Sequence, residues 1–200
     1  MTTMKNTLSR CILCAALAIA PSASADPSAT AWLRSKQATM LSASEWKDPN
    51  RSADGVCALW RGWGDWERIA AESVGPRVWG DLQEVHRSRL AALLADVSAL
   101  NWLRRARGGA FSVAYLREET AGRNRVVVTR VTVKGESADV RWVLAPAGEG
   151  FLLVDVVTEG ASLVSTQRSS FARVVERGGV NRLFTRLERK RDDLRAEVTR

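Results

Sequence analysis

Three side chains in this sequence could act in catalysis as proton-transfer groups or as a nucleophile. They are a lone histidine, a cysteine before an apolar run, and an aspartate at the end of an apolar strand. His86 lies four residues from both Leu82 and Leu90, so on a helix it shares their apolar face. That position favours a packed core histidine over a proton-transfer group. Cys57 precedes Ala-Leu-Trp, which favours a buried, inert thiol. Asp155 could be a general base, but we favour a carboxylate that accepts hydrogen bonds at a strand end.

These residues do not fall into a known catalytic or metal-binding motif. The sequence has no Gly-x-Ser-x-Gly turn, no His-Glu-x-x-His, no phosphate-binding glycine loop and no cluster of cysteine and histidine. We therefore predict a protein that is not an enzyme and that has no metal site and no cofactor. An enzyme that uses Asp155 or His86 in an apolar pocket stays open as the alternative.

The first 25 residues have the pattern of a secretory signal peptide. Lys5 and Arg10 precede an apolar run at 11–20, and Ala-Ser-Ala at 23–25 provides small residues for cleavage before Asp26. The apolar run is shorter than the ~20 residues that a membrane-spanning helix needs. We therefore predict export of a mature chain that begins at Asp26.

The mature chain, 26–200, is expected to form one basic domain. The full sequence has 30 Lys and Arg against 22 Asp and Glu, and loss of Lys5 and Arg10 leaves a net charge of +6. Cys57 then has no partner for an intrachain disulfide, so the fold must depend on its hydrophobic core. The charge suits lipid headgroups, an acidic protein surface or nucleic acid. Because export removes the usual target, we do not expect nucleic acid.

Helical patterns occupy residues 28–104. Turn-forming residues at 47–56 predict a loop between a first helix and a tryptophan-rich one. A long amphipathic helix follows, and Gly108-Gly109 is expected to end it. Its apolar positions, at helical spacing, are Leu82, Val85, Leu90, Leu93, Leu94, Val97 and Leu100.

Tryptophan is unusually frequent, with eight residues in the chain. Trp60, Trp63 and Trp66 recur every three residues, which predicts one side of a helix. The three rings either pack in the core against the long helix or form an exposed patch that touches a membrane or a partner.

The pattern changes to strict alternation over residues 110–157. Turn signals at 120–124, 134–136 and 145–150 divide this region into four strands. Since these connections are too short for crossover helices, the strands should form an antiparallel meander. Helices, then four strands, then helices indicate an α+β fold.

The last part of the chain contains a turn, a helix, a glycine pair and a second helix. Glu159-Gly160 turns the chain after the strand, a helix opens at Ser162, and Gly178-Gly179 separates it from a second helix that begins at Val180. In that second helix basic residues alternate with acidic ones, which predicts a solvated face with ion pairs.

This C-terminal order resembles the signature of the MlaC (toluene-tolerance) family. The shared features are an aromatic strand that ends in Asp-Val, then Glu-Gly-x-Ser-Leu, Arg-Ser-x-Phe and Gly-Gly. Gln167 departs from the pattern, since the family usually has tyrosine there. The similarity extends back through Trp66-Glu-Arg-Ile-Ala and Val74-Gly75, so it covers most of the mature chain.

The resemblance implies a monomeric periplasmic carrier of phospholipid. Members of the family have a curved four-stranded antiparallel sheet, related to cystatin or NTF2-like folds, with flanking helices that enclose an apolar cavity. The pathway of the family implies two partners, an inner-membrane ABC transporter complex and an outer-membrane lipid-handling complex, and a role in outer-membrane lipid asymmetry. A carrier of another hydrophobic ligand, such as a hopanoid or a toxicant, and a structural adaptor are alternatives.

On such a fold, apolar residues of one sheet face and of the helices opposite would line the cavity. Arg168 could bind a phosphate at the cavity mouth, or it could pair with Asp155 or Glu159 to fix the corner between strand and helix. The predicted lining residues are Val113, Tyr115, Val131, Trp142, Leu152 and Val154 on strands, and Leu93, Val97, Phe171 and Val174 on helices.

Overall fold

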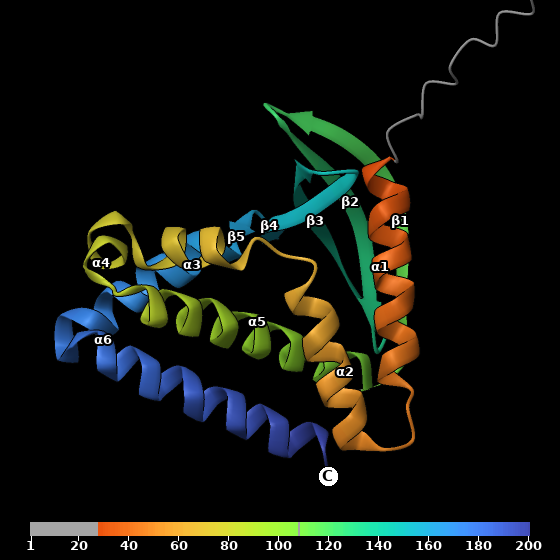
Figure 1. The fold of residues 1–200 in the computed structure, drawn as a ribbon. Helices are drawn as coiled ribbons and strands as arrows, with labels where there is room; N and C mark the ends of the chain where they lie inside the picture. The colour runs from red at the N-terminus through yellow and green to blue at the C-terminus, as the bar shows by residue number, and fades with distance from the viewer. Residues whose placement is uncertain (1–27, 108) are drawn as a thin grey trace, which may run out of the picture.

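The computed structural model describes residues 28–107 and 109–200, which fold into one antiparallel sheet and six helices (Figure 1). The predicted α+β class is confirmed. The predicted signal peptide, 1–25, lies outside the described residues. Within the described part, no helix combines the length and the apolar character that crossing a membrane requires.

The sheet is the predicted meander, because each strand pairs antiparallel with the next along the chain. The sequence predicts four strands, whereas the structure has a fifth. This fifth strand has two residues and forms where Val157 pairs with Ser162. Glu159 and Gly160 make this return possible with positive φ angles of 52° and 78°. The strands are β1 (Phe111–Ala121), β2 (Asn124–Val133), β3 (Glu136–Ala147), β4 (Gly150–Thr158) and β5 (Ala161–Ser162).

The strand register divides the side chains between an inner face, which the helices cover, and an outer face. Val113 on β1 lies opposite Val131 on β2, and Trp142 on β3 continues this inner face. β1 is an edge strand, and its register shifts between Tyr115 and Arg117. Figure 1 shows the long strands curving past α1 (Ala29–Ser44).

The prediction of a loop over 47–56 is wrong, because α2 (Pro49–Arg61) begins inside it. The Asp48 side chain caps this helix, accepting hydrogen bonds from the backbone N–H groups of Asn50 at 2.9 Å and Arg51 at 3.1 Å. Proline suits the first helical position, where its missing N–H is not needed. The Asp-Pro-Asn sequence is therefore a helix start and not a turn.

Trp60, Trp63 and Trp66 lie in the core, which contradicts the exposed-patch interpretation. They are also not on one helix, since α2 ends at Arg61 and α3 (Trp66–Val74) begins at the third tryptophan. The centroid of the Trp60 ring lies 4.9 Å from that of Trp63 and 6.4 Å from that of Trp66. The Trp66 Nε1–H donates to the Trp60 carbonyl oxygen at 2.9 Å. The three rings thus join α2 to α3.

A central helix, α5 (Glu84–Arg107), contacts α2, α3 and the C-terminal helix. Its apolar face is buried from Leu90 to Leu103, except at Val97, which is half-buried. The predicted apolar face is wrong at its start, because Leu82 precedes α5 and Val85 is 66% exposed. A short helix, α4 (Pro76–Asp81), connects α3 to this exposed start.

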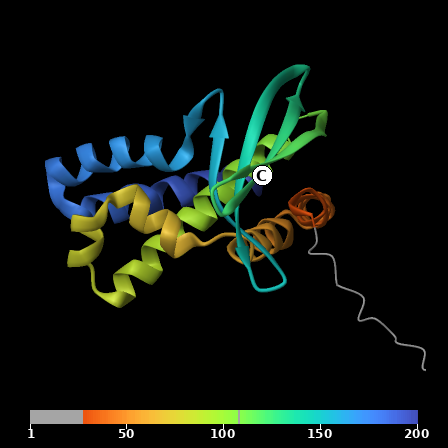
Figure 2. The same cartoon turned by 90° about the horizontal axis from the view of Figure 1, so that it is seen from above.

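The C-terminal helix, α6 (Leu163–Val198), is a hairpin of two arms that doubles back at Gly178 and Gly179 (Figure 2). Gly179 has a φ of 70°, a conformation that favours glycine over other residues. The predicted pair of helices around this glycine stop is confirmed.

The start of α6 is tied to the end of β4 by Asp155. Its carboxylate accepts hydrogen bonds from the Ser162 hydroxyl at 2.6 Å and from the Val164 backbone N–H at 3.2 Å. The Ser162 hydroxyl in turn accepts from the Ser165 backbone N–H at 3.1 Å. The predicted structural role of Asp155 is therefore confirmed.

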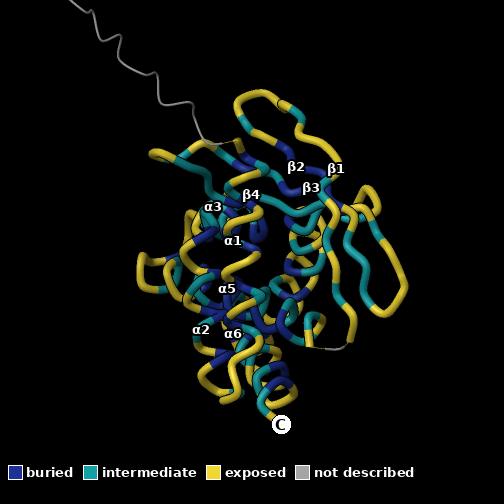
Figure 3. The backbone as a smooth tube through the Cα atoms, turned by 90° about the vertical axis from the view of Figure 1, so that its right-hand side faces the viewer, coloured by how far each residue is buried: buried dark blue, intermediate teal, exposed yellow. Residues whose placement is uncertain are grey.

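The hydrophobic core lies between the inner sheet face and the helices (Figure 3). Cys57 is part of it, only 2% exposed, as predicted. Next to it Asp96 accepts two hydrogen bonds from the Arg61 guanidinium, at 2.8 and 2.7 Å. Burial, with a smaller contribution from the Asp96 charge, raises the pKa of the Cys57 thiol to about 11 from its ordinary 9.0.

We predict that this thiol makes the stability of the protein sensitive to alkaline pH. The folded protein holds the thiol proton more tightly than the unfolded chain, so the contribution to stability is complete below pH 9 and is lost as the pH rises through 11. Between pH 8 and pH 10.5 the unfolding free energy should fall by about 2 kcal/mol more in the wild type than in Cys57→Ala. Urea unfolding at both pH values measures this difference, and equal losses in the two proteins would contradict it.

Candidate functional site

A pocket of about 360 Å³ lies between the inner face of the sheet and the C-terminal half of α5. Its strand wall is apolar, because alternate residues of β1 to β4 point to it. The strand residues are Phe111, Val113, Val131, Val133, Val140, Trp142, Val156 and Thr158; Gln37, Trp60, Ser98, Asn101, Trp102, Arg105, Ala161, Leu163 and Thr166 complete the lining.

Trp142 is held in this wall by its own hydrogen bond. The indole Nε1–H donates to the Thr129 hydroxyl oxygen at 2.9 Å, and the Thr129 hydroxyl donates to the Val140 carbonyl oxygen at 3.4 Å. Since the single polar atom of the indole is satisfied by the sheet, the ring adds apolar surface to the pocket and no unmet polar group.

Three side chains of the pocket lining carry polar groups that a ligand could meet. Gln37 is buried and accepts a hydrogen bond from the Tyr115 hydroxyl. The buried Trp60 Nε1–H has no acceptor among the described residues. Arg105 is exposed and makes no ion pair with any carboxylate that the structure describes. The pocket therefore offers a buried donor and a free cation.

The structure brings together only part of the predicted lining on the strands. Val113, Val131 and Trp142 line the pocket, and Tyr115 lies on the same face and holds Gln37. Burial raises the pKa of the Tyr115 phenol, so it stays a hydrogen-bond donor at neutral pH. The alternating pattern that identified these residues also contains Phe111, Val133, Val140 and Val156, which the prediction did not include.

The other predicted lining residues lie elsewhere. Leu152 borders a separate hollow beside α3 and α5, and Val154 is buried at the register shift between β3 and β4. Leu93 and Val97 pack in the helical core, away from this pocket. Phe171 and Val174 face a groove between the two arms of α6.

Arg168 and Gln167 connect α6 to α3. The Arg168 guanidinium donates to the Glu72 carbonyl oxygen at 2.6 Å, and among the described residues it has neither Asp155 nor Glu159 as a partner. The Ser73 hydroxyl donates to the Gln167 side-chain oxygen at 2.7 Å. The residue that departs from the family pattern thus makes a specific contact between helices.

The residues considered for catalysis are not assembled into a reactive site. His86 is half-buried rather than in the core, and its ring packs 5.9 Å from the Phe184 ring. Asp155 is occupied by the start of α6, and the Cys57 thiol is buried and protonated. In the described ranges no group of His, Cys, Asp and Glu could hold a metal ion.

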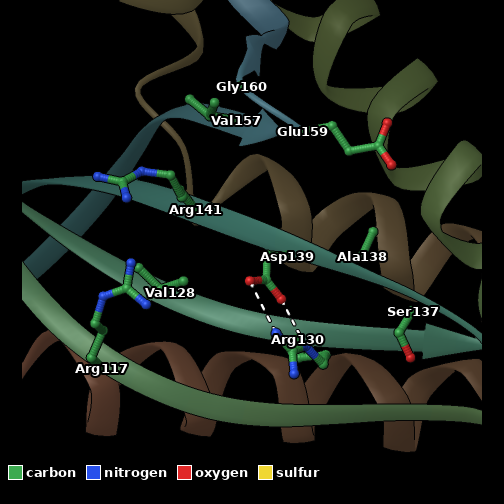
Figure 4. Close-up of a pocket in the computed structure, with 10 residues that line it drawn as sticks. All are labelled: Arg117, Val128, Arg130, Ser137, Ala138, Asp139, Arg141, Val157, Glu159 and Gly160. Atoms are coloured by element: carbon green, nitrogen blue, oxygen red, sulfur yellow. Dashed lines mark hydrogen bonds and ion pairs between the residues drawn. The ribbon is translucent and has the colours of Figure 1, made fainter.

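A second hollow, on the outer face of the sheet, is lined by charges that neutralise one another (Figure 4). Arg130 donates two hydrogen bonds across the strands to Asp139, at 2.8 and 3.2 Å. Arg117 and Arg141 both donate to Glu119, and they lower the pKa of this carboxyl. Because each arginine here has a carboxylate, the outer hollow has little capacity for a further anion.

Comparison with known proteins adds two findings. The family model described as "MlaC protein" matches residues 38–189. A solved structure of a phospholipid-binding protein from Ralstonia solanacearum, in complex with a phospholipid, superimposes with a TM-score of 0.69. It is 20% identical, and the match covers 83% of this chain and 98% of that chain.

Comparison with curated proteins gives no match. The solved structure supports the same fold, and the family model extends over most of the chain, including the strands of the inner pocket and α6 as far as Arg189. The chain belongs to the MlaC family.

Proposed function

We propose that this protein is a periplasmic lipid carrier that binds phospholipid acyl chains in the inner pocket. The observation that carries the proposal is the apolar wall of Val113, Val131 and Trp142, which faces about 360 Å³ of unfilled space in a chain of the MlaC family. Moving one methylene group from water to such a surface makes the free energy of binding more favourable by about 0.8 kcal/mol. A carrier therefore needs apolar walls more than it needs specific polar contacts.

The polar groups of the pocket suit the remainder of a phospholipid. The exposed Arg105 guanidinium matches a phosphate in geometry and charge. The buried Trp60 N–H would gain an acceptor from an ester carbonyl, which would remove the cost of an unpaired buried donor. The phospholipid in the Ralstonia protein supports this ligand class.

Transport requires that the lipid be received and released, and we propose two docking partners for these steps. One is an inner-membrane ABC transporter complex and the other an outer-membrane lipid-handling complex, as membership of the family implies. In this proposal the mature chain, 26–200, acts as a monomeric single domain after cleavage of the signal peptide. Its role is binding without covalent chemistry, which agrees with the structural roles of Asp155 and Cys57.

We expect the protein to carry lipid when it is purified gently from cells. Native mass spectrometry should show a stoichiometric adduct with the mass of a two-chain phospholipid, and extraction with organic solvent should identify it. If the protein shows only the mass of its ligand-free form and takes up no lipid from vesicles, the carrier proposal is wrong and a structural adaptor is favoured.

Filling the inner pocket should remove this adduct. Val131→Trp adds a large ring on the inner face, within the existing space, so we expect loss of the lipid adduct with the protein still folded. Thr132→Trp is the matched control, because the neighbouring residue points to the outer face. Equal lipid content in the two variants would show that the inner pocket is not the binding site.

Arg105 should distinguish lipids that have a phosphate from those that lack one. We expect Arg105→Gln to weaken phospholipid binding about tenfold, because a charge-assisted hydrogen bond is lost. Binding of diacylglycerol, which has the same chains and no phosphate, should be unchanged. Arg123→Gln, an exposed arginine in the turn between β1 and β2, controls for net charge. A similar loss for both lipids would assign Arg105 a role in folding and not in phosphate binding.

A further inference from the structure

The groove between the two arms of α6, which we call the α6 groove, is lined by cations that form no ion pair with the described carboxylates. It has a volume of about 730 Å³. Arg182, Arg186, Arg189 and Lys190 reach it from the second arm, and all four are exposed. Within residues 28–107 and 109–200 none of the four forms an ion pair, although Asp193 also lines the groove.

The ion pairs predicted for this helix face therefore form only in part. Arg191 pairs with Asp192 and Arg195 with Asp54, both away from the groove. In the α6 groove itself, four cations against one carboxylate leave an excess of three positive charges. Such an excess on one surface attracts anions over a distance of about a Debye length.

The floor of the groove is apolar but nearly closed to solvent. Phe171, Val174, Leu183 and Leu187 form it, and each is at most 8% exposed. Two hydroxyl side chains, Ser170 and Thr185, lie among the cations. A protein partner would need a deep apolar anchor point, which this floor does not offer. Phosphate groups need only cations and hydroxyls, which the groove supplies.

The end of the molecule at which the α6 hairpin turns also carries apolar side chains. The turn of α6, α4 and the start of α5 lie together at the end of the molecule away from the strands (Figures 1 and 2). This end carries the half-buried Trp79 and the exposed side chain of Val85. Tryptophan and cations beside exposed apolar groups are typical of surfaces at the headgroup level of a membrane.

We propose that the α6 groove docks the protein on a membrane surface that contains anionic phospholipids. The cations and hydroxyls of the groove contact headgroup phosphates. This docking surface is distinct from the inner pocket, because the two share no residue. It would bring the carrier to a bilayer without requiring a lipid inside the protein.

Vesicle sedimentation tests the proposal directly. The purified protein should bind phosphatidylglycerol vesicles and not phosphatidylcholine vesicles, and the binding should weaken as salt is added. A triple variant, Arg182→Gln, Arg186→Gln and Lys190→Gln, should lose about a hundredfold in vesicle affinity, since each cation near an anionic surface contributes about 1 kcal/mol.

A second triple variant provides the matched control. Lys47→Gln, Arg123→Gln and Lys134→Gln changes the net charge by the same amount at exposed residues outside the groove. Its vesicle affinity should stay within about threefold of the wild type. Circular dichroism melting shows whether both variants are folded; if the groove triple variant is not, Arg186→Gln alone should still weaken binding about fivefold.

Several outcomes would overturn the docking surface. Equal losses in the two triple variants would assign the attraction to net charge alone, and an unaffected groove variant would place the contact elsewhere. Groove-dependent binding to poly-glutamate without binding to vesicles would assign the groove to an acidic protein. The pocket variant Val131→Trp should bind vesicles like the wild type, so failure of the carrier proposal remains distinguishable from failure of this one.

Discussion

The main constraint on this structure is that helices must bury the apolar inner face of a curved sheet. α1, α3 and α6 contact the strands, and α5, whose apolar face is buried between Leu90 and Leu103, packs against α2, α3 and α6. Across the inner pocket from the strands, α5 presents Ser98, Asn101, Trp102 and Arg105. Ser98 and Asn101 are too small to interdigitate with the apolar strand residues to full density, and the inner pocket is the space that remains.

Much of this arrangement follows from local signals. The alternation of β1 to β4, the glycine pair in α6 and the role of Asp155 were all predictable, because each depends on neighbours in the sequence. The loop at 47–56 was predicted wrongly because Asp, Pro and Asn serve both turns and helix starts. Only the residues that follow, which pack α2 against α5, decide between the two.

The candidate site was less predictable than the fold. Periodicity assigns Val154 or Leu152 to a face, but the register shift between β3 and β4 moves residues relative to the pocket. Phe171 and Val174 have the spacing of a buried helix face, yet the element they face depends on how the α6 hairpin folds back. Arg105 has no motif around it, and only the tertiary structure places it at the pocket.

The charges of the chain are arranged differently on its different surfaces. On the outer sheet face, Arg117, Arg130 and Arg141 are each satisfied by a carboxylate on the same face. Such exposed pairs contribute little to stability, but they neutralise the surface. Among the described residues, the cations of the inner pocket and the α6 groove form no ion pairs, so unpaired positive charge lies at the two places where a lipid is proposed to bind.

The shifted register of β1 has a further consequence for the solution behaviour of the protein. The opposite edge of the sheet ends in the short β5, directly before α6, so in the described part of the chain β1 is the long edge strand. Its distortion at Tyr115 is followed by Arg117, Glu118 and Glu119, which put a bend and a row of charges where a second strand would add. These features oppose edge-to-edge aggregation. A protein with an exposed strand and an apolar interior is thereby protected against association through its own backbone.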